Sequence, residues 1–173
     1  INAAGGVLGK PVEYVQGDSG DTSTDTASTT VDRLLGESVD AIVGAASSGV
    51  SLTVIDKITA AGVLQISPAN TSEKLSTYAD NGLYYRTAPS DILQGAVLAN
   101  LIAGDGNQSV YIMALDDAYG TGLAASIGKN LEAAGVTVLG TKIYDPAAAT
   151  FDAEVGEVVA ANPDAIMLVT FDE

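Results

Sequence analysis

Residues 41–71 of this 173-residue chain read AIVGAASSGVSLTVIDKITAAGVLQISPANT. Short apolar runs at 41–43 and 63–66 flank a stretch, 50–61, whose apolar residues recur at helical spacing. A strand, helix, strand order usually produces two parallel strands in one sheet, with the helix on one face. The sequence therefore predicts a parallel α/β unit between residues 41 and 71.

A loop follows each of the two expected strands, at 44–48 and at 66–71. Ligands bind at the carboxyl ends of parallel strands, so both loops are expected at one edge of the sheet. Both contain small residues and hydroxyls, which allow backbone N–H groups and side chains to approach an oxyanion. The first loop also enters a helix N-terminus, which favours negative charge. A small anion site is predicted here, while an ordinary turn role for the same residues remains the alternative.

The same alternation continues along the whole chain. Helical spacing of apolar residues is found at 27–35, 50–61, 93–101, 123–134 and 151–159. Strand-like apolar runs lie at 12–16, 39–43, 63–66, 83–87, 110–115, 136–144 and 165–171. This order predicts an α/β fold with mainly parallel strands.

Two lobes are predicted from a break in this rhythm. The segment 67–82 is long and irregular, and a fresh strand and helix series begins at Ser90. We expect residues 1–88 to form one lobe and residues 89–173 to start a second, with the chain crossing at Ala88-Pro89. A single continuous sheet is the alternative.

Composition restricts the possible functions. The chain has no His, Cys or Trp, so it cannot build a thiol nucleophile, a Ser-His triad or a His-ligated metal site by itself. No catalytic residue, metal or cofactor is expected. With 7 Lys plus Arg against 22 Asp plus Glu and a net charge of −15, neither nucleic acid nor an anionic membrane surface suits this chain as a partner. No apolar run approaches the roughly 18 residues of a membrane span, so no direct membrane insertion is expected in this segment.

Several segments together resemble the extracellular solute-binding proteins of the branched-chain amino acid (Leu/Ile/Val-binding) ABC transporter type. These have the type I periplasmic-binding fold. The matching segments occur in the family's order over the whole chain: INAAGGVLG at 1–9, VGAASS at 43–48, ISPANT at 66–71, YRTA at 85–88, DAYGTG at 117–122 and TF at 150–151.

The resemblance implies a two-lobed clamp with three-layer αβα lobes. It also implies that this chain is incomplete at both ends, since the family's first strand and helix and the second half of its outer lobe have no counterpart here. The implied function is capture of a small zwitterionic ligand, a branched-chain or other aliphatic amino acid, for an ABC importer. The implied partners are that ligand and the membrane permease. The implied location is extracellular or periplasmic, including a cell-surface lipoprotein, and no enzymatic activity is implied.

The resemblance also implies roles for particular residues. Ser48 matches a serine whose hydroxyl and backbone N–H contact the ligand carboxylate, and Thr71 matches a threonine that does the same. Ala69 matches the residue whose backbone carbonyl accepts a hydrogen bond from the ligand ammonium. The family commonly has an acidic partner for that ammonium in the half of the outer lobe that has no counterpart here.

Four further residues complete the predicted site. Tyr119 matches an aromatic residue of the second lobe that contacts the ligand across the cleft. Phe171 lies near a position where the family often has Tyr, so a hydroxyl contact is lost there. Ser47 and Asn70 are candidates as neighbours of the matched residues, although neighbours in such loops often turn outward.

Other functions remain open at this point. An amide or urea-type solute suits the same neutral donors, and a sensor or receptor domain uses the same clamp to signal. An enzyme with a doubly wound sheet and Asp or Lys chemistry is the third alternative. Arg86 could meet a ligand carboxylate or form a structural ion pair. The pair Asp116-Asp117 is expected to cap the helix that follows.

Overall fold

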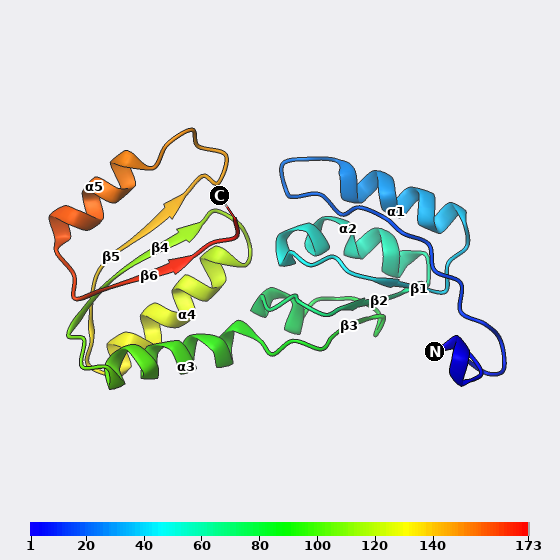
Figure 1. Cartoon of the computed structure of the whole chain (residues 1–173), viewed down its shortest axis with the longest axis horizontal. Helices are drawn as coiled ribbons and strands as arrows, with labels where there is room; N and C mark the ends of the chain where they lie inside the picture. Colours follow the sequence, from blue (N-terminus) through cyan, green and yellow to red (C-terminus); the bar gives the residue numbers. More distant parts are fainter. Residues whose placement is uncertain (173) are drawn as a thin grey trace.

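The computed structural model describes residues 1–172 and contains two parallel three-stranded sheets (Figure 1). The first has the order β1 (Ala41–Val43), β2 (Leu64–Ser67), β3 (Tyr84–Arg86). The second has the order β5 (Thr137–Tyr144), β4 (Ser109–Leu115), β6 (Ala165–Val169). All four strand pairings are parallel, as the alternation of elements predicts. We call the first sheet with its helices the first lobe and the second sheet with its helices the second lobe.

The first lobe carries its helices on one face of the sheet. Side chains of α1 (Thr26–Gly36) and α2 (Ser48–Ala60) form a core cluster with Ile42 of β1. On the opposite face, Val43 is 76% exposed and Tyr85 is 55% exposed. The expected third layer is therefore missing from the described part of this lobe, because α1 packs beside α2 and not on the opposite face.

The second lobe has all three layers. The central strand β4 is buried along almost its whole length. Helices α3 (Asp91–Gly104) and α4 (Gly120–Ala133) cover one face, and α5 (Asp152–Ala161) lies on the other (Figure 1). Their apolar side chains join β4 in the largest core cluster of the molecule, to which Ala99, Ile127, Leu131 and Val158 belong.

The expected strand at 12–16 is not formed. Within residues 1–172 this segment pairs with no other strand, and β1 is the edge of its sheet. An extended segment becomes a strand only where a neighbour supplies its backbone hydrogen bonds. Side chains hold it instead: Asn2 exchanges two hydrogen bonds with the backbone of Val12, and Arg33 donates to the carbonyl of Gln16 at 2.7 Å.

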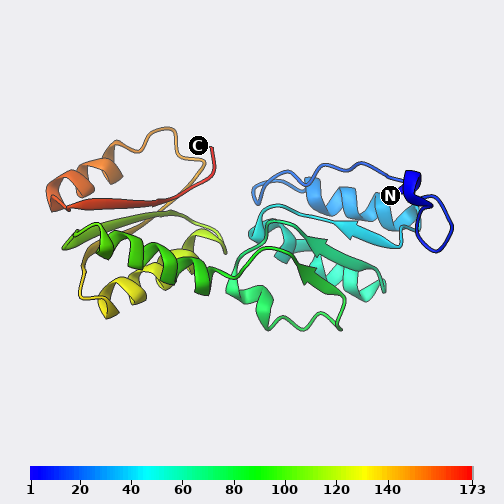
Figure 2. The same ribbon diagram turned by 60° about the horizontal axis from the view of Figure 1, so that its bottom comes forward.

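The described chain passes between the lobes once, through residues 87–90 (Figure 2). Thr87 still donates its backbone N–H to Ser67 of the first sheet, whereas α3 packs on α4 of the second lobe. The expected crossing at Ala88-Pro89 falls inside this connection. The exact division into domains at residue 88 stays a prediction. None of the helices in residues 1–172 combines the length and apolar character that a bilayer crossing requires.

Candidate ligand-binding site

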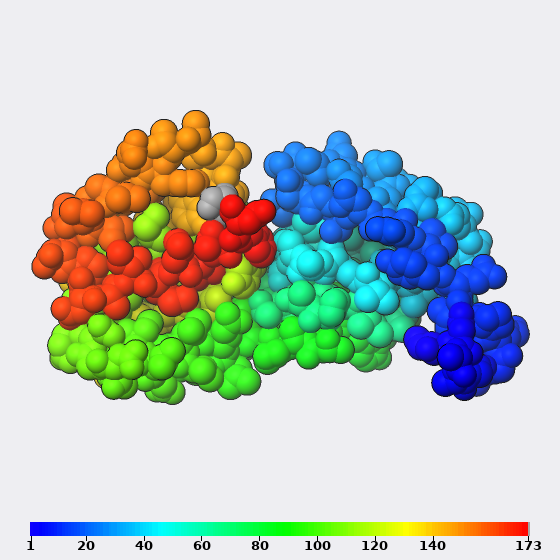
Figure 3. Space-filling model, in the orientation of Figure 1, coloured from blue at the N-terminus to red at the C-terminus, as the bar shows by residue number. Residues whose placement is uncertain are grey.

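A cavity of about 230 Å³ lies where the two lobes face each other. Figure 3 shows the lobes as two masses with a notch between them. The first lobe contributes the loops after β1 and β2, and the second contributes the start of α3, the loop before α4 and the segment after β6. The lining residues are Ala46, Ser47, Ser48, Ala69, Thr71, Gln94, Tyr119 and Phe171. Six of the seven predicted site residues are among them, and Asn70 is not.

Ser48 connects the two loops of the first lobe. Its side chain is 2% exposed, and its hydroxyl oxygen accepts hydrogen bonds from the backbone N–H groups of Thr71 (3.1 Å) and Ser72 (3.2 Å). A hydroxyl has two acceptor lone pairs and one hydrogen, so the hydrogen remains for donation to a further acceptor. The first turn of α2 also supplies free N–H groups beside it. Ser48 is thereby set up as a donor to an anion.

Thr71 lies in the cavity wall with its backbone N–H already occupied by Ser48. The contact of Thr71 with a ligand stays a prediction. The hydroxyl of Thr71 is the group that it can offer to a ligand.

Ser47 is the N-cap of α2, and its hydroxyl oxygen accepts from the backbone N–H of Val50 at 3.3 Å. This bond satisfies one of the helix N–H groups that have no partner inside the helix. Ser47 also lines the cavity, so the structure gives it a capping role beside its place in the candidate site.

Asn70 has a structural role in place of the predicted ligand contact. Its side chain is fully buried and donates to the carbonyls of Ala45 (3.1 Å) and Ala46 (2.8 Å). Its amide oxygen accepts from the hydroxyl of Tyr84 at 2.9 Å. Asn70 therefore turns inward and ties the second loop to the first, because it supplies the donors for the buried carbonyl of Ala45 and for the carbonyl of the exposed Ala46. Burial raises the pKa of its partner Tyr84 to about 12.

Ala69 occupies the cavity wall next to this residue. Its backbone N–H donates to the hydroxyl oxygen of Ser67 at 3.3 Å. The carbonyl oxygen is thus the polar backbone group that Ala69 can present to a ligand, which fits the expected acceptor role.

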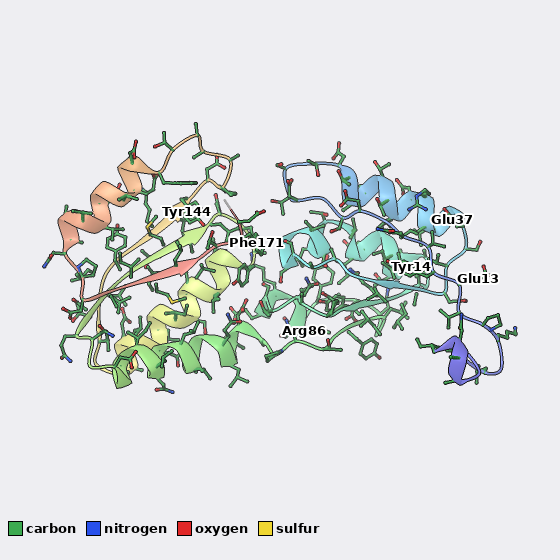
Figure 4. All side chains as sticks on the ribbon, viewed as in Figure 1. Glu13, Tyr14, Glu37, Arg86, Tyr144 and Phe171 are labelled. Carbon is green, nitrogen blue, oxygen red and sulfur yellow. The ribbon has the colours of Figure 1, made fainter. Side chains whose placement is uncertain are left out.

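Tyr119 and Phe171 form an aromatic wall on the second lobe. Their rings stack with centroids 5.4 Å apart and an interplanar angle of 22°. Figure 4 shows Phe171 at the junction, on the side that faces the first lobe. Burial raises the pKa of Tyr119, and the nearby carboxylates of Asp91 and Asp117 raise it further, whereas a hydrogen bond with Gln94 lowers it.

Gln94 and Asp91 are the site residues that sequence reasoning missed. Both belong to the first turn of α3, and Gln94 lines the cavity while Asp91 lies behind Thr71. The sequence predicted a helix at 93–101 but not which of its neighbouring residues would face the cavity. The N-cap of α3 is Ser90, whose hydroxyl accepts from the backbone N–H of Ile92 at 3.4 Å.

Asp91 is fully buried. Its backbone N–H donates to the carbonyl of Thr71 at 2.8 Å. Among the described residues neither of its carboxylate oxygens has a hydrogen-bond partner of good geometry. Burial raises the pKa of the Asp91 carboxyl above its ordinary value. The side chain of Thr71 and the charge of Arg86 act in the opposite direction, while Glu73 and Asp117 raise the pKa further.

This raised pKa predicts a pH-dependent contribution of Asp91 to stability. A carboxyl that holds its proton more tightly in the folded state favours folding at low pH. That contribution is fully present below pH 3.8, the ordinary pKa, and is lost as the pH rises through the folded-state value. We expect the free energy of unfolding to fall less with rising pH in Asp91→Asn than in the parent protein, because the asparagine side chain does not titrate. Denaturant unfolding of both proteins at a series of pH values below and above 3.8 measures this difference. Parallel pH profiles of the two proteins would contradict the assignment.

Arg86 and Asp117 of the acidic pair at 116–117 form hydrogen bonds within the protein. Arg86 donates to the backbone carbonyl of Ser72 (2.7 Å) and to the hydroxyl of Ser76 (2.6 Å), and it forms no ion pair within residues 1–172. Asp117 accepts from the backbone N–H of Gly120 at 2.6 Å, which caps α4 as expected. In the described part of the chain no cluster of acidic side chains is arranged to hold a metal ion.

Comparison with known proteins gives one family. A family model described as "Periplasmic binding protein" matches residues 1–172. The chain is 28% identical over 174 residues to the chemotactic signal transduction system substrate-binding protein BasB of Halobacterium salinarum, covering 97% of this chain and 41% of that protein. It is 27% identical over 168 residues to the Leu/Ile/Val-binding protein BraC3 of Rhizobium johnstonii, covering 96% of this chain and 45% of that protein.

Solved structures share the fold. The leucine-binding protein LivK of Thermotoga maritima superimposes with a TM-score of 0.87 at 25% identity, covering 96% of this chain and 47% of that chain. The branched-chain amino acid transporter substrate-binding protein LivJ of Streptococcus pneumoniae, solved with isoleucine, superimposes with a TM-score of 0.81 at 26% identity, covering 96% and 47%. The chain thus spans less than half the length of these relatives.

Proposed function

This chain belongs to the periplasmic binding protein family, and on that premise we propose that it captures a small zwitterionic ligand, an aliphatic amino acid, between its two lobes. The observation that carries the proposal is the cavity between the lobes. It brings together a hydroxyl donor on Ser48, a carbonyl acceptor on Ala69 and the aromatic wall of Tyr119 and Phe171.

The charges around the cavity suit a zwitterion. The ligand carboxylate would meet the Ser48 hydroxyl and the N-terminus of α2, where free N–H groups favour negative charge. The ammonium would meet the Ala69 carbonyl. A dianion such as a sugar phosphate would need more positive charge, and Arg86 is already engaged with Ser72 and Ser76. The net charge of −15 also repels dianions more than zwitterions.

The relatives support a branched-chain ligand. The Rhizobium protein is described as Leu/Ile/Val-binding, and the Streptococcus structure contains isoleucine. An apolar ligand side chain would lie against Tyr119 and Phe171. Burial of their aromatic surface on binding would contribute favourably to affinity. Following these relatives, the full protein would deliver its ligand to the membrane permease of an ABC importer and would lie outside the cytoplasmic membrane.

A sensory role is a second candidate because the Halobacterium relative is described as part of a chemotactic signal transduction system. In both roles the two lobes would close on the ligand. The roles differ in the partner protein that the closed, ligand-bound form contacts. Deleting the gene separates them: loss of ligand uptake supports the importer component, and loss of taxis toward the ligand with normal uptake supports the sensor.

We expect an aliphatic amino acid to raise the melting temperature of the full-length protein, because a ligand that binds only the folded state stabilises it by mass action. At a ligand concentration 100 times the Kd, the gain is about 2.7 kcal/mol, which raises the melting temperature by several degrees. A thermal-shift panel of amino acids, amides, sugars and phosphates provides the measurement. A response to amides alone supports the amide or urea alternative, and a response to phosphorylated compounds alone contradicts the zwitterion proposal.

A further inference from the structure

A hydrogen bond between Ser72 and Ala118 joins the two lobes beside the cavity. The hydroxyl of Ser72, in the loop after β2, donates to the backbone carbonyl of Ala118, in the loop before α4, at 3.0 Å. Each residue is next in sequence to one that lines the cavity, Thr71 or Tyr119, but neither is itself among the lining residues. The Ser72–Ala118 bond therefore connects the lobes without passing through the position of a ligand.

Ser72 is held in place by the first lobe. The residue is fully buried, and its backbone N–H donates to the hydroxyl oxygen of Ser48 at 3.2 Å. Its backbone carbonyl accepts from the guanidinium of Arg86 at 2.7 Å. Both backbone groups of Ser72 are thus used within the first lobe, and its hydroxyl is the group that reaches across. Because the residue is already fixed, the hydroxyl loses little further freedom when it forms the bond to Ala118.

Ala118 is held in the same way by the second lobe. The carboxylate of Asp117, the residue before it, accepts from the backbone N–H of Gly120 at 2.6 Å. The backbone carbonyl of Asp117 accepts from the backbone N–H of Thr121 at 3.1 Å and from its hydroxyl at 2.6 Å. These bonds attach the turn that carries Ala118 to the first turn of α4. The Ser72–Ala118 bond consequently joins two parts that are each fixed within their own lobe.

The lobes also approach each other closely at Gly49, in the first turn of α2. A methyl group at this position would lie 3.1 Å from a carboxylate oxygen of Asp117 and 2.8 Å from a methyl carbon of Thr22. The N-terminus of a helix favours a neighbouring carboxylate, so the position of Asp117 beside α2 is a favourable one. The second lobe is therefore in close contact with the first here, and lobes that move apart by more than a fraction of an ångström break the Ser72–Ala118 bond.

We propose that the hydroxyl of Ser72 stabilises the closed arrangement of the lobes and thereby raises the affinity for every ligand by one common factor. A ligand that needs both lobes binds the closed form, so its apparent Kd is the Kd of the closed form divided by the closed fraction. The Ser72–Ala118 bond raises that fraction without contacting the ligand. Ser72 is thus a positioning residue that acts on affinity and not on the choice of ligand. The inference goes beyond the proposed function, because closure can be measured without a ligand.

The test measures the separation of the lobes in the full-length protein without ligand. Spin labels are attached to cysteines introduced by Thr29→Cys on α1 and Ala160→Cys on α5, two exposed positions in a chain segment that has no cysteine of its own. Both helices lie on the side of the molecule away from the connection at 87–90, where opening changes the separation most (Figure 1). Pulsed electron paramagnetic resonance then gives the populations of the short and the long distance. The ratio of closed to open form should fall about two- to tenfold in Ser72→Ala, the effect of one neutral hydrogen bond.

Ser76→Ala is the matched control. Its hydroxyl accepts from Arg86 at 2.6 Å, which is a bond within the first lobe, so its loss should leave the ratio of closed to open form unchanged. Ser72→Ala keeps both backbone bonds of Ser72, and the first lobe should therefore stay folded, which thermal unfolding checks.

Affinity provides a second measurement on the same variants. Isothermal titration calorimetry with leucine and with valine should show that both Kd values rise in Ser72→Ala by the factor by which the closed fraction falls. The ratio of the two Kd values should stay that of the parent protein.

The outcomes separate this inference from the proposed function. The same distance distribution in Ser72→Ala and in the parent protein would overturn the inference. An equal shift in Ser72→Ala and Ser76→Ala would show a general loosening of the loop after β2, with the same consequence. A changed ratio of the Kd values for leucine and valine would show that Ser72 acts on the choice of ligand, and it would also overturn the inference. If the parent protein binds no amino acid, the proposed function fails, while the spin-label distances still decide the role of Ser72.

Discussion

Amino acid binding is expected to weaken about tenfold or more when Ser48 is replaced by alanine, which corresponds to roughly 1.5–3 kcal/mol for a hydrogen bond to a charged group. Two losses combine in this variant. The ligand carboxylate loses the hydroxyl hydrogen, and the backbone N–H groups of Thr71 and Ser72 lose their shared acceptor. The second loss loosens the loop that carries Ala69 and Thr71, so the acceptor for the ammonium becomes less well placed.

Calorimetry with leucine on the full-length Ser48→Ala protein measures this effect. Ser90→Ala is the matched control, because Ser90 also lies at a helix N-terminus and caps α3, but it does not line the cavity. The control should lose about 1 kcal/mol of stability, the usual value of an N-cap, with no change in affinity. Unchanged affinity in Ser48→Ala would remove Ser48 from the site.

The largest expected effect on stability belongs to Asn70. Asn70→Ala leaves the buried hydroxyl of Tyr84 and the carbonyl of Ala46 without their partner, while the carbonyl of Ala45 keeps its bond from Ser67. The buried hydroxyl of Tyr84 left unsatisfied costs about 1–3 kcal/mol, and the hydrogen bond lost at the exposed Ala46 adds about 0.5–1.5 kcal/mol, so the total loss is about 1.5–4.5 kcal/mol. The melting temperature of the full-length protein should fall by several degrees.

Thermal unfolding of the ligand-free full-length protein checks this expectation, with Asn100→Ala as the control. Asn100 is exposed on α3, where a substitution should stay within about 0.5 kcal/mol. A small stability loss in Asn70→Ala together with a large loss of affinity would contradict the structural role and restore the predicted ligand contact.

Much of the fold could be predicted from local sequence. The alternation of apolar periods predicts five helices and parallel strands, and all five helices form. Local patterns suffice for these elements because a helix completes its hydrogen bonds within its own residues. The run at 12–16 has strand composition but no neighbour in the described chain, and so it stays unpaired. Pairing depends on a second segment, which local composition cannot report.

The candidate site shows the same division. From the two loops that follow parallel strands and from their family motifs, the sequence predicted that Ser48, Ala69 and Thr71 lie together, since parallel strands end at one edge of the sheet. The structure places all three in the wall of one cavity. Side-chain direction within those loops depended on which buried groups needed partners, and for that reason Asn70 turned inward to two carbonyls. Asp91 and Gln94 became part of the site only because residues 87–90 carry the chain into the second lobe and place the first turn of α3 behind Thr71. Their contribution depends on how the lobes are placed, and long-range packing alone decides that placement.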